Sequence, residues 1–153
     1  MSEKFGFSGG TGGAAYNAPA PPAQDQGPWK ISELKGRSGD RINQVELIWE
    51  NHKHATREGG PFGGGGGGPF EFKIASDDYL TKIRGSVNNF DGSVRIFSLQ
   101  FATRDGGVSP AFGKETAFTF FFDCPKGYQI TGLFSRSGTE VDGLGVYIDL
   151  IPG

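Results

Sequence analysis

The chain has 153 residues and a mass of 16.3 kDa, which favours a single domain large enough to bury a core. Glycine fills 27 positions and proline 9, but 14 phenylalanines exclude a wholly disordered chain, which would lack such an apolar content. The formal charge of −2 and the lack of a basic run argue against nucleic acid and anionic membranes as partners.

Cysteine content and hydropathy narrow the class further. Cys124 is the one cysteine in the sequence, so an internal disulfide is excluded, and no Cys/His spacing resembles a zinc site. No segment is long and apolar enough for a signal peptide or a membrane span. We therefore expect a protein without membrane insertion that is cytoplasmic or exported by an unconventional route.

Apolar residues alternate with polar ones along most of the chain. In chain order, the alternating runs are residues 45–49, 70–74, 97–101, 118–122 and 144–150. Each run has the length of a strand, is rich in β-branched or aromatic residues and is bounded by turn-forming residues. No window of helix length shows a helical stripe. The pattern predicts an all-β fold, either a sandwich, a barrel or a prism.

Two segments interrupt the strand pattern. Residues 18–28, APAPPAQDQGP, contain too much proline for a central strand and predict an inserted surface loop. Residues 59–69 contain six consecutive glycines, and the apolar sequence on both sides favours a loop within one domain. His52 and His54 are two residues apart but have no third ligand nearby, so we expect surface or turn residues.

An internal repeat opens three of the predicted strands. Residues 39–49 and 138–148 share a glycine, three further residues and then an Asn or Asp before the alternating run. Residues 87–97 fit the same pattern without the leading glycine, which places Asp91 in register with the other two Asx residues. Three similar units suggest a β fold with pseudo-threefold symmetry.

The loop at residues 138–142, Gly-Thr-Glu-Val-Asp, has chemistry suited to a sugar. Its glycine permits a tight connection and leaves backbone amides uncovered, while the Asp carboxylate can accept hydrogen bonds from adjacent hydroxyls. Taken alone, a Gly-x-x-x-Asp segment is more often a plain turn than a binding site.

Longer stretches of the sequence resemble one lectin family. FSRSGTEVDGLGVYIDL resembles the C-terminal signature of jacalin-related lectins, GGTGGAAYN their first glycine loop, and IRGSVNNFDGSVRIFSLQFATRDGG their central strands. The resemblance covers residues 4–17 and 29–151. It implies one domain over residues 1–153, folded as a β-prism of three four-stranded antiparallel sheets, that binds carbohydrate without metal or other cofactor.

The resemblance also implies two sites. The primary site would consist of Gly13, Gly138, Thr139, Glu140, Val141 and Asp142. In it Asp142 would accept bonds from two sugar hydroxyls, the amides of Thr139 and Glu140 would donate, and the Glu140 side chain would border the sugar. The secondary site would consist of Gly67, Gly39, Asp40, Arg41 and Asn43. Because Asn43 replaces the expected Asp, this site would lose about 1 kcal/mol, several-fold in affinity.

A third site, around Asp91, lacks a facing glycine cluster and is expected to be inactive. In the family, a cleaved glycine loop accompanies galactose binding, so the uncut GGTGG points to mannose or glucose and to mannose-rich glycans and glycoproteins as partners. A homo-oligomer is one route to avidity. Two alternatives stay open: a β-prism interaction module that has lost sugar binding, and a glycoside hydrolase using Glu140 and Asp142. The preferred interpretation is a lectin without enzymatic activity.

Overall fold

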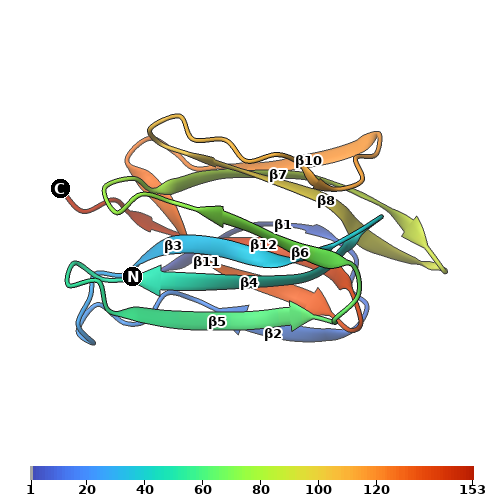
Figure 1. Ribbon diagram of the computed structural model, residues 1–153, viewed down its shortest axis with the longest axis horizontal. Helices are drawn as coiled ribbons and strands as arrows, with labels where there is room; N and C mark the ends of the chain where they lie inside the picture. The colour runs from blue at the N-terminus through green and yellow to red at the C-terminus, as the bar shows by residue number, and fades with distance from the viewer. Residues whose placement is uncertain (1) are drawn as a thin grey trace.

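The computed structural model describes residues 2–153, which form twelve strands and contain no helix. The strands are β1 (Glu3–Gly9), β2 (Ala14–Ala18), β3 (Lys30–Ser38), β4 (Ile42–Glu50), β5 (Thr56–Gly63), β6 (Gly68–Lys73), β7 (Leu80–Phe90), β8 (Ser93–Thr103), β9 (Phe112–Gly113), β10 (Phe118–Asp123), β11 (Tyr128–Ser137) and β12 (Val141–Leu150). They run side by side along the long axis of the molecule (Figure 1). With no helix among the described residues, none can span a membrane.

The strands form three antiparallel sheets of four strands each. Their orders are β1-β12-β11-β2, β5-β4-β3-β6 and β10-β7-β8-β9. Each sheet has a hairpin of two consecutive strands at its centre and two further strands at its edges, and the central strands of each sheet contact those of the others. The predicted β-prism with pseudo-threefold symmetry is confirmed.

One backbone hydrogen bond recurs in all three sheets and gives the true register of the repeat. An amide just after an edge strand donates to a carbonyl near the start of a central strand. The three bonds run from Gly10 to Asp142, from Gly64 to Asn43 and from Lys114 to Phe97, at 2.8, 2.9 and 2.9 Å. Asp142, Asn43 and Phe97 are therefore the equivalent positions.

The predicted register of the third repeat is wrong. Asp91 lies in the turn between β7 and β8, is exposed and has a φ of 51°. Phe97, six residues further on, occupies the place that Asp142 takes in its own sheet. The β7–β8 hairpin is therefore longer than the other two. The third unit of the repeat has the aromatic ring of Phe97 where the first site has the carboxylate of Asp142.

The inner faces of the sheets form one core. Leu34, Val45, Leu99, Leu133 and Leu144 are completely buried within it. The predicted alternation holds for residues 45–49 and 144–148, but Leu150 is 66% exposed because it ends the last strand.

Two further residues depart from the predicted faces. Phe118 at the start of edge strand β10 is 62% exposed. A register shift opposite Ser86 and Val87 displaces Phe97, so Ile96 and Ser98 are buried instead. Local bulges and strand ends therefore account for the exceptions, since an added residue turns every later side chain to the other face.

The proline-rich stretch is a loop, as predicted. The predicted loop at residues 59–69 is wrong in extent, because residues 59–63 pair with β4 as part of β5 and residues 68–69 pair with β3 as part of β6, which leaves residues 64–67 as the loop. The proline-rich stretch connects β2 to β3, and the glycine run connects β5 to β6 within one sheet. His52 lies in the turn after β4, and the Nδ1 atom of His54 lies 3.7 Å from a carboxylate oxygen of Glu50. Among residues 2–153, no group of three or more His, Cys, Asp or Glu side chains is arranged to hold a metal ion.

Candidate functional site

The predicted binding loops meet at one end of the prism, at the right of Figure 1. The β11–β12 and β3–β4 turns are closed by the same hydrogen bond: Gly138 N donates to Glu140 O, and Gly39 N to Arg41 O, each at 3.0 Å. The first turn faces the β1–β2 loop and the second faces the β5–β6 loop. The two predicted sites therefore have matching backbones.

Glycine is required where each loop touches its turn. Gly13 has a φ of 67°, and a Cβ atom there would lie 2.4 Å from the carbonyl oxygen of Ser137. Gly67 has a φ of 69°, and its Cβ would lie 2.6 Å from the carbonyl oxygen of Ser38. Both conformations belong to the left-handed region that side chains disfavour. The structure thus places the two predicted glycines against the two predicted turns.

An arginine at the end of a central strand holds each glycine loop. Arg136 donates to the carbonyl oxygens of Thr11 and Gly13 at 2.8 and 3.0 Å. Arg37 donates in the same way to the carbonyl oxygens of residues 65–67, at 2.7 to 3.1 Å. Because the arginines occupy carbonyl oxygens, the hydrogen-bonding capacity left to each loop is weighted toward its amides.

Asp142 faces the first glycine loop. The residue is 6% exposed, and a Cβ on Gly12 would lie 2.7 Å from its Oδ2 atom. Burial raises the pKa of Asp142, while the charge of Arg95, whose Nε lies 4.0 Å from Oδ2, opposes the rise. Asn43 has the same relation to the second loop, since a Cβ on Gly66 would lie 2.8 Å from its Nδ2 atom. The carboxylate and the amide thus occupy equivalent places.

The Glu140 side chain is held by two arginines from other parts of the chain. Arg41 holds its carboxylate with two hydrogen bonds, Nε to Oε1 at 2.6 Å and Nη2 to Oε2 at 2.9 Å. Arg95 adds a third, from Nη1 to Oε1, at 2.9 Å. Burial alone would raise the pKa of Glu140, but the hydrogen bonds from both guanidinium groups outweigh it and lower the pKa. The charged Glu140 carboxylate therefore serves to hold the turn in place. The backbone groups of the loop are the ones left to bind a ligand.

The two predicted sites share a wall. Arg41 comes from the β3–β4 turn and Glu140 from the β11–β12 turn, so their ion pair joins the primary loop to the secondary loop. Gly64 packs on the primary loop as well, because a Cβ there would lie 2.5 Å from the carbonyl oxygen of Thr139. Phe90, at the end of β7, stacks on the Arg41 guanidinium with 3.6 Å from Cζ to the ring centre.

The remaining predicted residues divide into exposed and buried ones. Val141 is completely buried in the core and has no surface for a ligand. Gly39, Asp40, Gly138 and Thr139 are exposed at the tips of their turns. In each turn, the first two residues therefore face solvent and the residues that follow anchor the turn.

Four residues of the site were missed by the sequence analysis: Arg37, Arg136, Arg95 and Phe90. A signal exists for the first two, because Arg-Ser-Gly precedes both turns. Arg95 and Phe90 lie in the longer β7–β8 hairpin, and nothing in their local spacing connects them to Glu140.

Three four-stranded sheets with two glycine loops facing two matched turns define the structural class of the protein, a β-prism. Residues 5–147 match the family model described as a jacalin-like lectin domain, and the chain belongs to this family.

Individual relatives agree over nearly the whole length. Horcolin from Hordeum vulgare subsp. vulgare is 27% identical over 148 residues, which are 95% of each chain. The structure of wild-type Malaysian banana lectin is 26% identical, with a TM-score of 0.83 over 99% of this chain and 100% of that one. A mannose-binding jacalin-related lectin from Ananas comosus has a TM-score of 0.83 at 22% identity, covering 98% and 99% of the two chains.

Proposed function

We propose that the protein binds mannose- and glucose-type sugars, including mannose-rich glycans on glycoproteins, through the primary site and without a metal. The observation that carries the proposal is the Asp142 carboxylate set against the glycine loop that contains Gly12 and Gly13. Asp142 accepts bonds from adjacent sugar hydroxyls, while the backbone amides of Gly13, Thr139 and Glu140 donate to the sugar's oxygens.

The choice of mannose rests on two supports. The β1–β2 loop is continuous through the glycines, as in the mannose-type members that the sequence resembles. The Ananas comosus lectin with the same fold is described as mannose-binding. Sugar–protein bonds replace sugar–water bonds of similar strength, so a single site should bind with a Kd on the order of millimolar to micromolar.

The secondary site binds the same class of sugar more weakly. Asn43 occupies the place of Asp142, and Gly67 faces it from the second glycine loop. The amide offers one uncharged acceptor oxygen where a carboxylate offers two charged ones. Two sites on one chain raise the avidity for branched glycans, and a homo-oligomer would raise it further.

A glycoside hydrolase is disfavoured by the state of Glu140. A general acid needs a raised pKa so that it holds a proton at neutral pH. Hydrogen bonds from Arg41 and Arg95 lower the pKa of Glu140, so it is not the acid. The same bonds occupy both of its oxygens, so it is not free to act as nucleophile or base beside Asp142, whose pKa is raised. We therefore propose binding without catalysis.

Calorimetric titration with methyl α-mannoside and a glycan array test this function on wild type, Asp142→Ala and Asn43→Ala. Asp142→Ala should remove most of the heat and the array signal, and Asn43→Ala should remove a smaller part. Asp77→Ala, an exposed carboxylate in the turn before β7, is the control and should bind like wild type. Unchanged affinity of Asp142→Ala would refute the site, and an empty array for wild type would favour the interaction-module alternative.

A further inference from the structure

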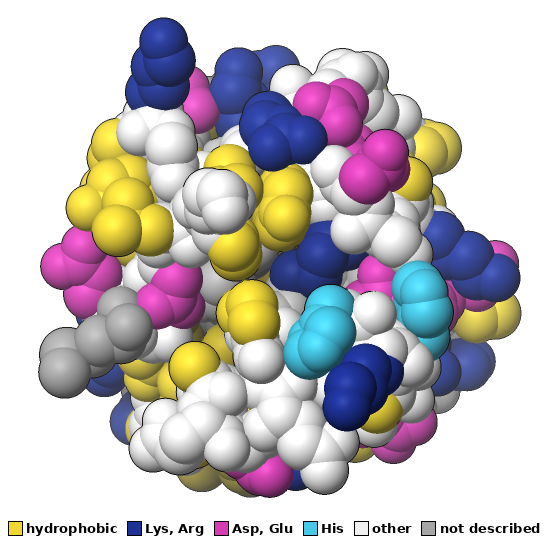
Figure 2. Space-filling view, turned by 90° about the vertical axis from the view of Figure 1, so that its left-hand side faces the viewer, with side chains coloured by type: hydrophobic (Ala, Val, Ile, Leu, Met, Phe, Trp, Pro, Cys, Tyr) yellow, Lys and Arg dark blue, Asp and Glu magenta, His cyan; other side chains and the backbone are white. Residues whose placement is uncertain are grey.

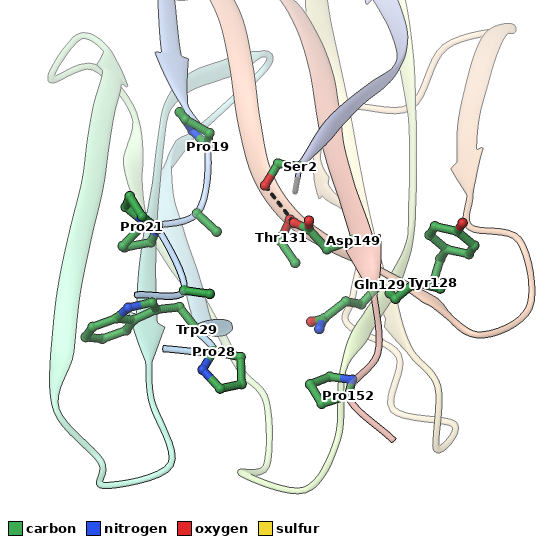
Figure 3. Close-up of a pocket in the computed structure, with 14 residues that line it drawn as sticks. Ser2, Pro19, Pro21, Pro28, Trp29, Tyr128, Gln129, Thr131, Asp149 and Pro152 are labelled. Atoms are coloured by element: carbon green, nitrogen blue, oxygen red, sulfur yellow. Dashed lines mark hydrogen bonds between the residues drawn. The ribbon is translucent and has the colours of Figure 1, made fainter. Parts of the chain in front are cut away.

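A groove lies at the end of the prism opposite to the binding loops (Figures 2 and 3). One wall of the groove is the proline-rich loop between β2 and β3, with Pro19, Pro21 and Pro28. The other wall is formed by β11 and β12, with Thr131 and Asp149. The volume of about 500 Å³ lies in the range of small-molecule sites.

The proline-rich loop is fixed in place by several contacts. Its Trp29 indole donates to the carbonyl oxygen of Asp25 at 2.8 Å, and the Asp25 carboxylate lies 2.6 Å from an Arg57 nitrogen. Asn51, beyond the end of β4, donates to the carbonyl oxygen of Gln26 at 3.0 Å. The wall of the groove is therefore built by specific bonds to other parts of the sheet.

Gln129 supplies an unused acceptor inside the groove. Its side chain extends from β11 toward Trp29 and Pro28 (Figure 3), and the residue is 3% exposed. Its Oε1 atom is buried without a hydrogen-bond partner among the described residues. An unsatisfied buried acceptor destabilises the protein, and a donor from a bound molecule would remove that cost. Gln129 therefore points to a ligand that carries hydrogen-bond donors.

The rest of the lining limits the kind of donor. Proline residues have no N–H, and the Trp29 N–H is used within the loop, so these walls offer flat apolar faces and carbonyl oxygens. Asp149 is the one charged side chain among the described lining residues, which disfavours an anion. Ser2 donates to it at 2.7 Å and Thr131 donates to the same oxygen, so a bound cation would compete with these two donors.

A neutral ring with hydroxyl donors and C–H faces fits this lining. We propose that the groove is a saccharide-binding site in which Gln129 accepts from a sugar hydroxyl and the prolines pack against the ring, beside the buried Trp29. An adjoining hollow of about 290 Å³ shares Pro28, Trp29, Gln129 and Pro152 with the groove and adds the charged side chains of Lys30 and Glu50. It provides room for a second ring.

The proposal goes beyond the function assigned to the glycine loops and does not depend on it. β11 runs from the groove to the primary site over 10 residues, which at ~3.3 Å each places the two about 30 Å apart. One chain with sites at both ends bridges two glycans without forming an oligomer, which converts weak single sites into avidity.

Nitrogen-15 NMR of the wild-type protein tests the proposal, with the Trp29 indole N–H as reporter. The probes are the methyl glycosides of mannose, glucose, galactose and N-acetylglucosamine, each raised to tens of millimolar. At least one should shift the Trp29 indole and Gln129 side-chain signals in a saturable manner. Shifts confined to the glycine loops would overturn the groove proposal and leave the primary site supported. Shifts confined to Trp29 and Gln129 would support the groove and overturn the primary site.

Variants separate binding from structure. Gln129→Met keeps the length of the side chain and removes the acceptor, so the shifts at Trp29 should weaken at least ten-fold while Tm does not fall. Gln24→Met makes the same change on an exposed part of the loop and should leave the titration unaltered. Ala20→Phe places a ring in the groove from the proline-rich loop, leaves the Gln129 side chain in the sequence and should abolish the shifts. Full retention of the Trp29 shifts in Gln129→Met or Ala20→Phe would overturn the proposal.

Discussion

Replacing Glu140 by glutamine tests whether the ion cluster at the binding end stabilises the fold. The substitution keeps the shape of the side chain and removes its charge. Three hydrogen bonds from Arg41 and Arg95 end on the carboxylate, and the three side chains are only 10–19% exposed. The change therefore leaves two guanidinium groups close together without their shared anion.

The expected loss follows from the burial of this cluster. A hydrogen bond to a charged group contributes ~1.5–3 kcal/mol, and breaking a fully buried ion pair costs ~3–5 kcal/mol. Because Glu140 and its partners keep some contact with water, we expect about 3 kcal/mol. For a chain of this size, that loss lowers Tm by ~6–12 °C.

Scanning calorimetry and urea unfolding at neutral pH measure the effect, with Glu58→Gln on exposed β5 as control. The lowered pKa of Glu140 means that its stabilisation is complete above the ordinary Glu pKa of about 4.3 and is lost as the pH falls through the folded-state pKa. The Tm difference between wild type and Glu140→Gln should therefore close in acid. If the variant melts with wild type at neutral pH, the cluster contributes no net stability and the reasoning is wrong.

Three further predictions concern single residues. Asp142→Asn should abolish most mannoside binding in calorimetry while Tm stays the same or rises, because burial raises the pKa of Asp142 and so disfavours its charge. Wild-type affinity should accordingly decline as the pH falls through that raised pKa, and affinity held constant down to the ordinary Asp value of about 3.9 would contradict this. Asn43→Asp should strengthen secondary-site binding several-fold in an NMR titration; no gain would show that charge is not what this site lacks. Cys124, whose pKa burial raises to about 12, should resist iodoacetamide at neutral pH until the protein is unfolded, and rapid labelling of the folded chain would contradict its burial.

The strands were predictable because their causes are local, whereas the prism of three sheets was predicted through the family resemblance. Alternating apolar residues identify strands wherever one face is buried, and Val45 and Leu144 lie where that alternation places them. Gly13 and Gly67 were assigned through the family resemblance, and the structure supplies the physical reason, since a tight approach of two loops leaves no room for a Cβ. For the strands, the physical requirement is expressed within a few residues of sequence.

The predictions failed where contacts between distant parts of the chain determine the register of a strand or the partners of a side chain. Asp91 imitates the repeat pattern, but the added length of the β7–β8 hairpin moves the equivalent position to Phe97. Glu140 lies 99 residues from Arg41 and 45 from Arg95, so no spacing shows that its carboxylate is occupied. Hairpin length and long-range ion pairs are set by the assembled prism, and one sequence carries no local sign of either.

The ion cluster also changes how the two glycine-loop sites are to be understood. Arg41 was predicted as part of the secondary site and Glu140 as part of the primary site, yet each is the other's closest charged partner. Gly64 adds a backbone contact to Thr139, so the secondary glycine loop rests directly on the primary turn. A sugar that shifts either turn must therefore act on the wall that both share. The two glycine-loop sites therefore form one structural unit, in which Arg41 and Glu140 each hold the turn that supplies the other.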